Sequence, residues 1–468
     1  MFRSLLAFLF LTVISFSIQA QSGYDIEVSI SDYDEPEIYL AYYYGDKTYI
    51  KDTTYRTEEG TYIFSGEESL PVGVYMVALP PNNSFFELLI DEEQQFSVSS
   101  QYSDLIGTLE IHGDAPDNKQ FYEYMQFLNE KRVESSSLQA IVEDESTPKT
   151  SLGKSAARIE LTKLNEEVEA YQQDLLNSNP KSFTSTIIKS GLPLNEPDFE
   201  GENAETLRWR WYQKHFFDNI DLGDPRLLRS PVLFNRVDYF INKLQIQHPD
   251  TISKAIDWVL TQMEPAPETY KYYTVHFVNT YAQSKMMGMD AVYVHLINKY
   301  YATGKADWAE QEMLEKMLTS AAKIEPLLIG NEAPNAIWRK QDGSILRLHD
   351  VESPLTLLLF WRYDCSSCIA ETAALQEVYE SYKNKGLSII AVCTKTGDEV
   401  SACWEYANQK GYTDWIHVAD ANNEFGGMDS YDVRSTPLVY LLNDQKEIVA
   451  KKISVDQLSQ VLDQMTGN

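Results

Sequence analysis

Two cysteines, Cys365 and Cys368, are separated by two serines and follow the strongly apolar stretch 355–361. This spacing predicts that Cys365 lies at the cap of a helix and Cys368 one turn inside it. Free backbone N–H groups and the positive end of the helix dipole stabilise an anion there, lowering a thiol pKa from about 8.5 into the range ~3.5–7.5. We expect Cys365 to attack a disulfide as a thiolate, and Cys368 to close the ring that releases the product.

Other chemistries also use this cysteine spacing, namely half of a zinc site or an inert structural disulfide. Zinc needs more ligands, and the final segment offers only four, none arranged as a second such pair: Cys393, Cys403, His349 and His417. No glycine-rich phosphate loop points to a flavin or nicotinamide site. The sequence therefore favours redox chemistry with no metal and no cofactor beyond the Cys365–Cys368 couple.

The remaining two cysteines, Cys393 and Cys403, fall at the end of a predicted strand and in the next predicted helix. Cysteine packs well as a small hydrophobic residue, so we predict two buried thiols. A second disulfide is an alternative. A third redox thiol at Cys393 is another, because sites form at the carboxyl ends of strands in open α/β sheets.

The elements around these cysteines alternate between strand and helix, which predicts a mixed sheet covered on both faces. Strands are expected at 355–361 and 387–394, with helices at 366–385, closed by Gly386, and at 399–410, ending at Gly411. A hairpin of 438–442 with 447–453 and an amphipathic helix at 455–465 complete the segment.

Residues 329–466 resemble the exported thioredoxin-like ResA/TlpA family of thiol–disulfide oxidoreductases. Four motifs carry the resemblance in order: Gly-Asn-Glu-Ala-Pro at 330–334, Asp-Gly at 342–343, Leu-Phe-Trp at 359–361, and Ser-Thr-Pro at 435–437. They are similar to the family's domain opening, its hairpin turn, the strand before its active site and its cis-proline loop. A peroxidase is disfavoured, because a peroxidatic cysteine usually has a threonine three residues before it, and Arg362 occupies that position here.

The resemblance implies roles for further residues. Pro437 would adopt the cis form beside the disulfide, and the backbone of Thr436 would pair with the substrate chain. Trp361 and Tyr363 would line the substrate site. Glu371 shares a helix face with Cys368, and by resemblance it would tune the thiol pKa values and relay a proton; an ordinary exposed carboxylate is the alternative.

One position departs from the family. The residue before the first cysteine is usually Trp, and here it is Asp364. A carboxylate beside the sulfur opposes thiolate formation, whereas Arg362 can offset it. We predict that Asp364→Trp or Asp364→Asn lowers the pKa of Cys365, which the pH dependence of thiol alkylation would test.

The front of the chain has two other periodicities. Residues 21–115 hold short runs rich in Tyr, Ile, Val and Phe, separated by Pro, Gly and Asp, which predicts an antiparallel all-β sandwich or barrel. Between residues 23 and 115 there are 19 acidic and 3 basic residues. We interpret this charge as a solvated outer sheet face, with a surface for cations or a basic partner as the alternative.

Residues 116–325 show apolar positions at helical intervals, as in 252–263, which predicts a helical array with Asp250-Thr251 capping that helix. The polar stretches 132–154 and 193–203 are expected to be exposed connections. Three histidines lie on separate helical stretches and are interpreted as packed or surface residues rather than metal ligands: His215, His276 and His295. The segments 215–222 and 287–295 resemble domains of unknown function that accompany thioredoxin-like modules in Bacteroidota envelope proteins.

Residues 1–20 contain Arg3, an apolar run at 5–18 and a small residue at Ala20, as in an export signal. A retained membrane anchor is the alternative, although the run is shorter than the roughly 20 residues that a bilayer crossing needs. The chain has 468 residues and a net charge of −31, which repels nucleic acid and anionic lipid. Export places the cysteines where they can oxidise.

Together these features predict a multidomain protein of the periplasm or cell envelope. After a signal peptide at 1–20, it comprises an acidic all-β sandwich (21–115), an α-helical array (116–325) and an α/β thioredoxin fold (326–468). The thioredoxin fold would reduce disulfides of envelope proteins, with electrons from an upstream thiol donor. No membrane span is expected in the mature chain, and the sequence does not define an oligomeric state. The alternative is a non-catalytic binding or scaffold protein with a vestigial thioredoxin-like domain.

Overall fold

The computed structural model describes residues 23–146, 148 and 150–467. The predicted export signal at 1–20 lies outside the described residues. The chain divides into two compact units, with the boundary between Asp238 and Tyr239. This boundary falls inside the segment predicted to be helical, and the two units are described in turn.

The first unit opens with two four-stranded sheets, in the orders β4-β1-β7-β8 and β3-β2-β5-β6. All neighbouring strands are antiparallel except β1 and β7, which are parallel. The prediction of a purely antiparallel arrangement was therefore wrong for one pair. The strands are β1 (Tyr24–Ser31), β2 (Glu37–Tyr44), β3 (Lys47–Tyr55), β4 (Tyr62–Gly66), β5 (Gly73–Leu79), β6 (Ser84–Ile90), β7 (Gln95–Gln101) and β8 (Glu110–Gly113).

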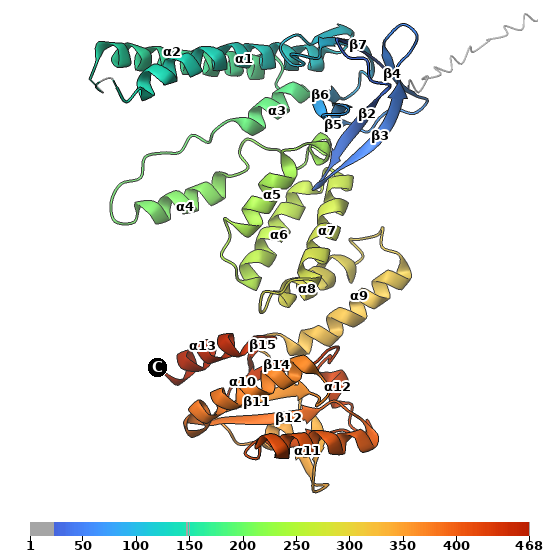
Figure 1. Cartoon of the computed structure of the whole chain (residues 1–468), viewed down its shortest axis with the longest axis vertical. Helices are drawn as coiled ribbons and strands as arrows, with labels where there is room; N and C mark the ends of the chain where they lie inside the picture. The colour runs from blue at the N-terminus through green and yellow to red at the C-terminus, as the bar shows by residue number, and fades with distance from the viewer. Residues whose placement is uncertain (1–22, 147, 149, 468) are drawn as a thin grey trace, which may run out of the picture. The chain divides into compact units, whose positions relative to one another are not determined.

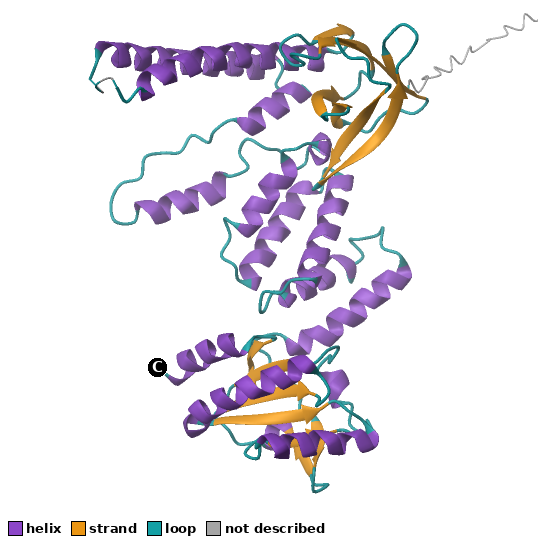
Figure 2. Cartoon of the chain, viewed as in Figure 1, coloured by secondary structure: helices purple, strands orange, loops and turns teal. Residues whose placement is uncertain are grey.

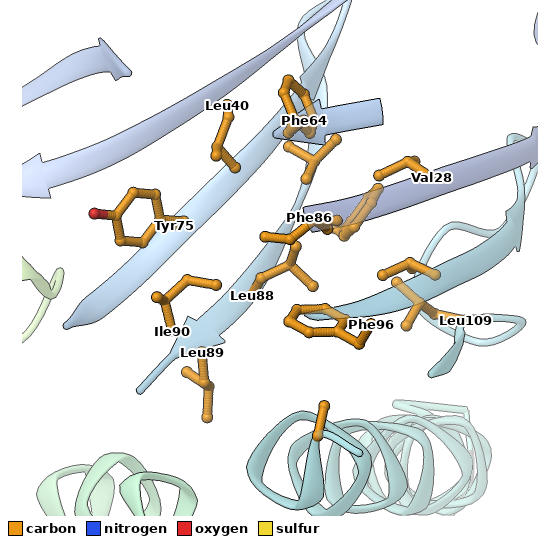
Figure 3. Close-up of a cluster of buried hydrophobic side chains, with 14 of the residues drawn as sticks. Val28, Leu40, Phe64, Tyr75, Phe86, Leu88, Leu89, Ile90, Phe96 and Leu109 are labelled. Atoms are coloured by element: carbon orange, nitrogen blue, oxygen red, sulfur yellow. The ribbon is translucent and has the colours of Figure 1, made fainter. Parts of the chain in front are cut away.

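Alternate residues of these strands point into a core between the sheets, as a pleated strand requires. Figure 3 shows Val28 and Phe64 from one sheet near Leu40 and Phe86 from the other. All four are at most 1% exposed. Each buried side chain of this size contributes roughly 1.5–3 kcal/mol, so the shared core holds the sheets together as a β-sandwich.

A long helical pair follows the sandwich, formed by α1 (Pro116–Glu143) and α2 (Leu152–Ser178), which lie side by side (Figure 1). The predicted exposed connection at 132–154 was wrong at both ends, because α1 continues to Glu143 and α2 begins at Leu152. Contacts with α2 stabilise this polar helix: Phe127 stacks on Tyr171 with ring centroids 4.2 Å apart, and Lys131 Nζ lies 2.6 Å from Glu167 Oε2.

Two shorter helices complete the first unit, α3 (Phe183–Gly191) and α4 (Ala204–His215), and α5 (Leu233–Asn242) crosses the unit boundary. The irregular segment 193–203 between α3 and α4 confirms the second predicted connection.

Four further helices follow α5 in the second unit. They are α6 (Pro249–Met263), α7 (Pro267–Ala282), α8 (Asp290–Leu296), which continues into a π-helical turn (Ile297–Tyr301), and α9 (Gln311–Ile324). The predicted apolar face of α6 is buried. Its predicted cap was wrong: His248 caps the helix and Pro249 starts it, because proline is favoured at the first helical position.

Two of the histidines singled out in the sequence pair with carboxylates. His215 Nδ1 lies 2.7 Å from Asp218 Oδ2, and His295 Nε2 lies 2.9 Å from Asp257 Oδ2. The ring of His276 packs against that of Tyr272, with the centroids 6.0 Å apart. Within the described part of the chain, no group of three or more His, Cys, Asp or Glu residues has metal-site geometry.

The C-terminal part is a seven-stranded mixed sheet in the order β10-β9-β13-β12-β11-β14-β15, with helices on its faces (Figure 2). Its strands are β9 (Ile337–Lys340), β10 (Ile345–Arg347), β11 (Leu355–Trp361), β12 (Leu387–Cys393), β13 (Ile416–Ala419), β14 (Leu438–Leu442) and β15 (Ile448–Lys451). Its helices are α10 (Ser366–Tyr382), α11 (Val400–Lys410), α12 (Gly427–Ser430) and α13 (Val455–Thr466).

Strand β11, between β12 and β14, explains why this sheet is covered on both faces. All seven of its residues are buried. Leu357 and Leu359 belong to one apolar core, and Leu358 and Phe360 to a second core on the opposite face. The sequence prediction of a multidomain protein with a sandwich, a helical array and a C-terminal α/β domain is confirmed.

A buried ion pair joins this sheet to the helices that precede it in the second unit. Lys451 of β15 is only 2% exposed, and its Nζ lies 2.7 Å from Asp290 Oδ2 at the start of α8. The same Nζ donates to the carbonyl oxygen of Leu327 at 2.5 Å. Burial lowers the pKa of Lys451, and Asp290 opposes that effect.

No helix among residues 23–146, 148 and 150–467 has both the length and the apolar composition that a bilayer crossing requires.

Candidate active site

The cysteine pair lies where β11 gives way to α10. Cys365 is the residue that caps α10, and its Sγ accepts the backbone N–H of Cys368 at 3.2 Å. The hydroxyl of Ser367 lies 3.1 Å from the same sulfur. The predicted placement is confirmed, because Cys365 stands at the start of the helix and a backbone N–H of the first turn points at its sulfur.

The two sulfurs differ sharply in their environments. Cys365 is partly exposed and Cys368 is buried. Burial opposes ionisation of Cys365, but hydrogen bonds from Cys368 and Ser367 outweigh it and lower the pKa of Cys365 to about 7. Burial, and then the neighbouring Cys365, raise the pKa of Cys368 to about 11. At neutral pH a large share of Cys365 is therefore thiolate, while Cys368 keeps its proton.

The predicted proline loop approaches the same sulfur. The Thr436–Pro437 peptide bond is cis, as the resemblance implies. The carbonyl oxygen of Thr436 lies 3.5 Å from Cys365 Sγ. The structure therefore places a segment about 70 residues away in the chain beside the sulfur of Cys365.

Glu371 lies in α10, one turn after Cys368, and is partly buried. Burial raises the pKa of its carboxyl group, and Asp456 at the start of α13 raises it further. A raised pKa makes this carboxylate a better proton acceptor than an exposed one.

The two aromatic residues expected to line the site lie in different surroundings. Trp361 is fully buried beneath the site, with its ring centroid 5.9 Å from that of Tyr406. It offers no surface to a substrate in this structure. Tyr363 is partly exposed, and the ammonium of Lys395 lies 5.5 Å from its ring centroid.

Asp364, the residue that departs from the family, is paired with two cations. Its Oδ2 lies 2.9 Å from Lys395 Nζ, and its Oδ1 lies 3.3 Å from Arg362 Nε. Hydrogen bonding to Lys395 lowers the pKa of Asp364, which therefore stays ionised. Arg362 was considered from the sequence, but Lys395 was missed because it lies on the loop after β12 and only the fold brings it near.

The prediction of two buried thiols at Cys393 and Cys403 was wrong. The two residues are at most 1% exposed, as expected, but they form a disulfide. Cys393 ends β12 and Cys403 lies in α11, with Cα atoms 6.3 Å apart. Such a separation is within the normal range for a disulfide. The two cysteines come this close because α11 packs back against β12, which the sequence alone did not indicate.

Two parts of the chain match known protein families. Residues 329–451 match the AhpC/TSA family, and residues 197–323 match a domain of unknown function, DUF5106. The second match covers both segments that resembled accessory domains of thioredoxin-like proteins.

Named relatives match the same C-terminal region. The thiol-disulfide oxidoreductase ResA of Bacillus anthracis is 29% identical over 133 residues, which are 28% of this chain and 73% of the relative. ResA of Bacillus subtilis is 26% identical over 125 residues, 27% of this chain and 67% of the relative. The C-terminal domain is thus a thioredoxin-like domain with ResA homologues.

Among solved structures, a domain of a possible thiol-disulfide isomerase from Cytophaga hutchinsonii is 32% identical, with 30% of this chain and 93% of that chain covered and a TM-score of 0.28. A thioredoxin-like protein from Bacteroides caccae is 18% identical, with 58% and 98% covered and a TM-score of 0.45.

Proposed function

We propose that this chain, a thiol–disulfide oxidoreductase with a thioredoxin-like C-terminal domain, reduces disulfides of other exported proteins. One observation carries the proposal. The Sγ of Cys365 accepts a backbone N–H at the start of α10 and has a pKa of about 7, whereas the buried thiol of Cys368 has a pKa of about 11. This asymmetry separates a thiol that attacks from a thiol that resolves.

The reaction has two exchange steps. The Cys365 thiolate attacks one sulfur of the client disulfide, so that a mixed disulfide forms and the other client sulfur leaves as a thiolate. Cys368 then loses its proton and attacks Cys365. The client's second sulfur leaves, the Cys365–Cys368 disulfide forms, and the client has gained two electrons and two protons. A thiol donor protein returns the site to the dithiol state.

Three other residues support these steps in the proposal. Glu371 accepts the proton of Cys368 during resolution, since its own pKa is raised by burial. The backbone of Thr436 and the ring of Pro437 hold the client chain beside Cys365. The exposed part of Tyr363 contributes a further contact, while Trp361 supports the loop from below.

The proposed setting is the periplasm or cell envelope, which follows from the export signal read in residues 1–20. Clients would be envelope proteins that contain disulfides, and the reductant would be an upstream thiol protein. The net charge of −31 disfavours nucleic acid as a partner.

The test is reduction of insulin disulfides by the full chain in the presence of dithiothreitol. We expect Cys365→Ser to abolish activity. In a separate single turnover, with pre-reduced Cys368→Ser and no dithiothreitol present, a mixed disulfide between Cys365 and insulin should accumulate and be seen by mass spectrometry. Activity that survives Cys365→Ser would refute the assigned nucleophile. No reduction by the unmodified chain would favour the scaffold alternative.

The direction of transfer is tested separately. Equilibration of the Cys365–Cys368 couple with glutathione or dithiothreitol gives its reduction potential. A reductant should lie near −270 mV, and a value near −120 mV would indicate an oxidant.

A further inference from the structure

Two loops lie next to each other at the ends of β11 and β12. One is the β11–α10 loop, residues 362–365, which contains Cys365, and the other is the β12–α11 loop, residues 394–399. The β11–β12 pairing extends past the strand ends, because the N–H of Thr394 donates to the carbonyl oxygen of Trp361 at 2.9 Å. This pairing brings Lys395 level with the residues just before Cys365.

Lys395 makes the closest charged contact to that segment. Its Nζ lies 2.9 Å from Asp364 Oδ2 and 2.7 Å from Glu399 Oε2. The side chain of Lys395 is only 18% exposed, against 47% for Arg362, whose Nε lies 3.3 Å from the other Asp364 oxygen. Ion pairs strengthen as solvent is excluded. Lys395 is therefore the main counter-ion of Asp364.

The segment that carries Lys395 is fixed at both ends. Cys393 and Cys403 are disulfide-bonded and 10 residues apart, and the loop between them contains both Lys395 and Glu399. A closed loop of this length restricts the chain on both sides of the ion pair. The N–H of Gly397 also donates to the carbonyl oxygen of Ala421, at 2.8 Å.

We propose that Lys395 is a positioning residue for Cys365, which holds and neutralises the Asp364 carboxylate so that the sulfur ionises beside an ion pair rather than beside a free negative charge. This inference rests on the proposed function, since it concerns the same nucleophile. An adjacent carboxylate without a counter-ion would raise the pKa of a thiol. The chain thus accommodates an acidic residue at a position where the family uses tryptophan.

Several charged side chains lie on the two loops described above and on α10. The loop before it contributes Arg362 and Asp364, and the β12–α11 loop contributes Lys395 and Glu399. On α10 the partly buried Glu371 follows, with Asp456 of α13 acting on it. Of these groups, Arg362 and Lys395 are the two positive charges that pair with Asp364.

The experiment measures the rate at which iodoacetamide alkylates Cys365 in the reduced full chain as a function of pH, with peptide mass spectrometry as the readout. We expect Lys395→Met to shift the midpoint of the profile upward and to slow alkylation at pH 7 by about two- to fivefold. Lys395→Arg should restore most of the rate. Lys385→Met, in the short helix that follows α10, removes a lysine next to Tyr382 and should leave the profile unchanged.

The double variant Asp364→Asn/Lys395→Met decides whether Lys395 acts through Asp364. Asp364→Asn alone should shift the midpoint downward. In that background Lys395→Met should have little further effect, because its partner is already uncharged. An unchanged midpoint in Lys395→Met, or an equal shift with and without Asp364, would overturn the proposal.

This readout uses no client disulfide. Failure to reduce insulin would therefore count against the proposed function alone, and an unchanged alkylation profile against the role of Lys395 alone.

Discussion

The two cysteine pairs of this domain lie close in sequence and have opposite properties. Cys365 caps a helix, remains partly exposed and accepts one backbone N–H. Cys393 and Cys403 join the end of a strand to a helix in an apolar core and are disulfide-bonded. The difference teaches that the position of a cysteine relative to a helix start and to solvent, rather than its residue type or spacing, separates a reactive thiol from a structural one.

The largest expected contrast is in reactivity. In the native chain treated with dithiothreitol and then iodoacetamide, we expect Cys365 to be alkylated at least about a thousandfold faster than Cys393 or Cys403, because the latter react only when the fold opens. Peptide mapping by mass spectrometry measures the three rates. Fast labelling of Cys393 in folded protein would break the comparison.

The second contrast is in stability. We expect Cys393→Ala/Cys403→Ala to lower the free energy of unfolding by about 2–3 kcal/mol, from loss of a 10-residue loop closure. Denaturant titration of the second unit's transition measures the loss. The matched control is Cys365→Ser in the reduced chain, which should change stability by under about 0.5 kcal/mol. Similar losses in the two proteins would contradict a structural role confined to one pair.

A third prediction sharpens the asymmetry within the reactive pair. Glu371→Gln removes the proposed proton acceptor for the Cys368 thiol, whose pKa is about 11. We expect resolution of the mixed disulfide to slow by about tenfold at pH 7. The difference in rate between the variant and the unmodified chain should shrink as the pH approaches the pKa of Cys368, because the thiol then ionises without help. Single-turnover release of client thiol follows this step. A deficit that is constant with pH would assign Glu371 a structural role instead.

The smallest expected effect concerns the hydroxyl 3.1 Å from Cys365 Sγ. Ser367→Ala removes one hydrogen bond to the thiolate, so the pKa of Cys365 should rise and alkylation at pH 7 should slow about two- to threefold. Ser366→Ala, in the same helical turn, is the control, since the sulfur's described contacts are with Ser367, Cys368 and Thr436. Equal effects of the two substitutions would remove Ser367 from the site.

Local patterns in the sequence were enough to predict the elements that hold the site. The apolar run at 355–361 is strand β11 without change of bounds, and the helix after it begins at Ser366, as expected. Capping acts between neighbouring residues, so a lowered pKa for Cys365 could be expected from its place at a predicted helix start. The cis bond before Pro437 agreed with the family resemblance.

Contacts between distant loops explain what the sequence did not reveal. Lys395 and Asp364 are separated by about 30 residues, and only the pairing of β11 with β12 brings them together. The Cys393–Cys403 bond likewise depends on how α11 returns over β12. The polar residues 132–143 looked like a linker because stabilisation of α1 comes from α2, through contacts such as Phe127 with Tyr171.

The buried ammonium group of Lys451 makes the stability of the C-terminal domain depend on Asp290, which lies upstream of that domain. A fragment cut at the predicted boundary, residue 325, would keep this buried cation and the Leu327 carbonyl but lose the Asp290 carboxylate. An excised fragment would have to hydrate, deprotonate or expel that side chain, each at a cost to its folding. Engineering of a portable version should therefore begin upstream of Asp290 or replace Lys451 with an apolar residue.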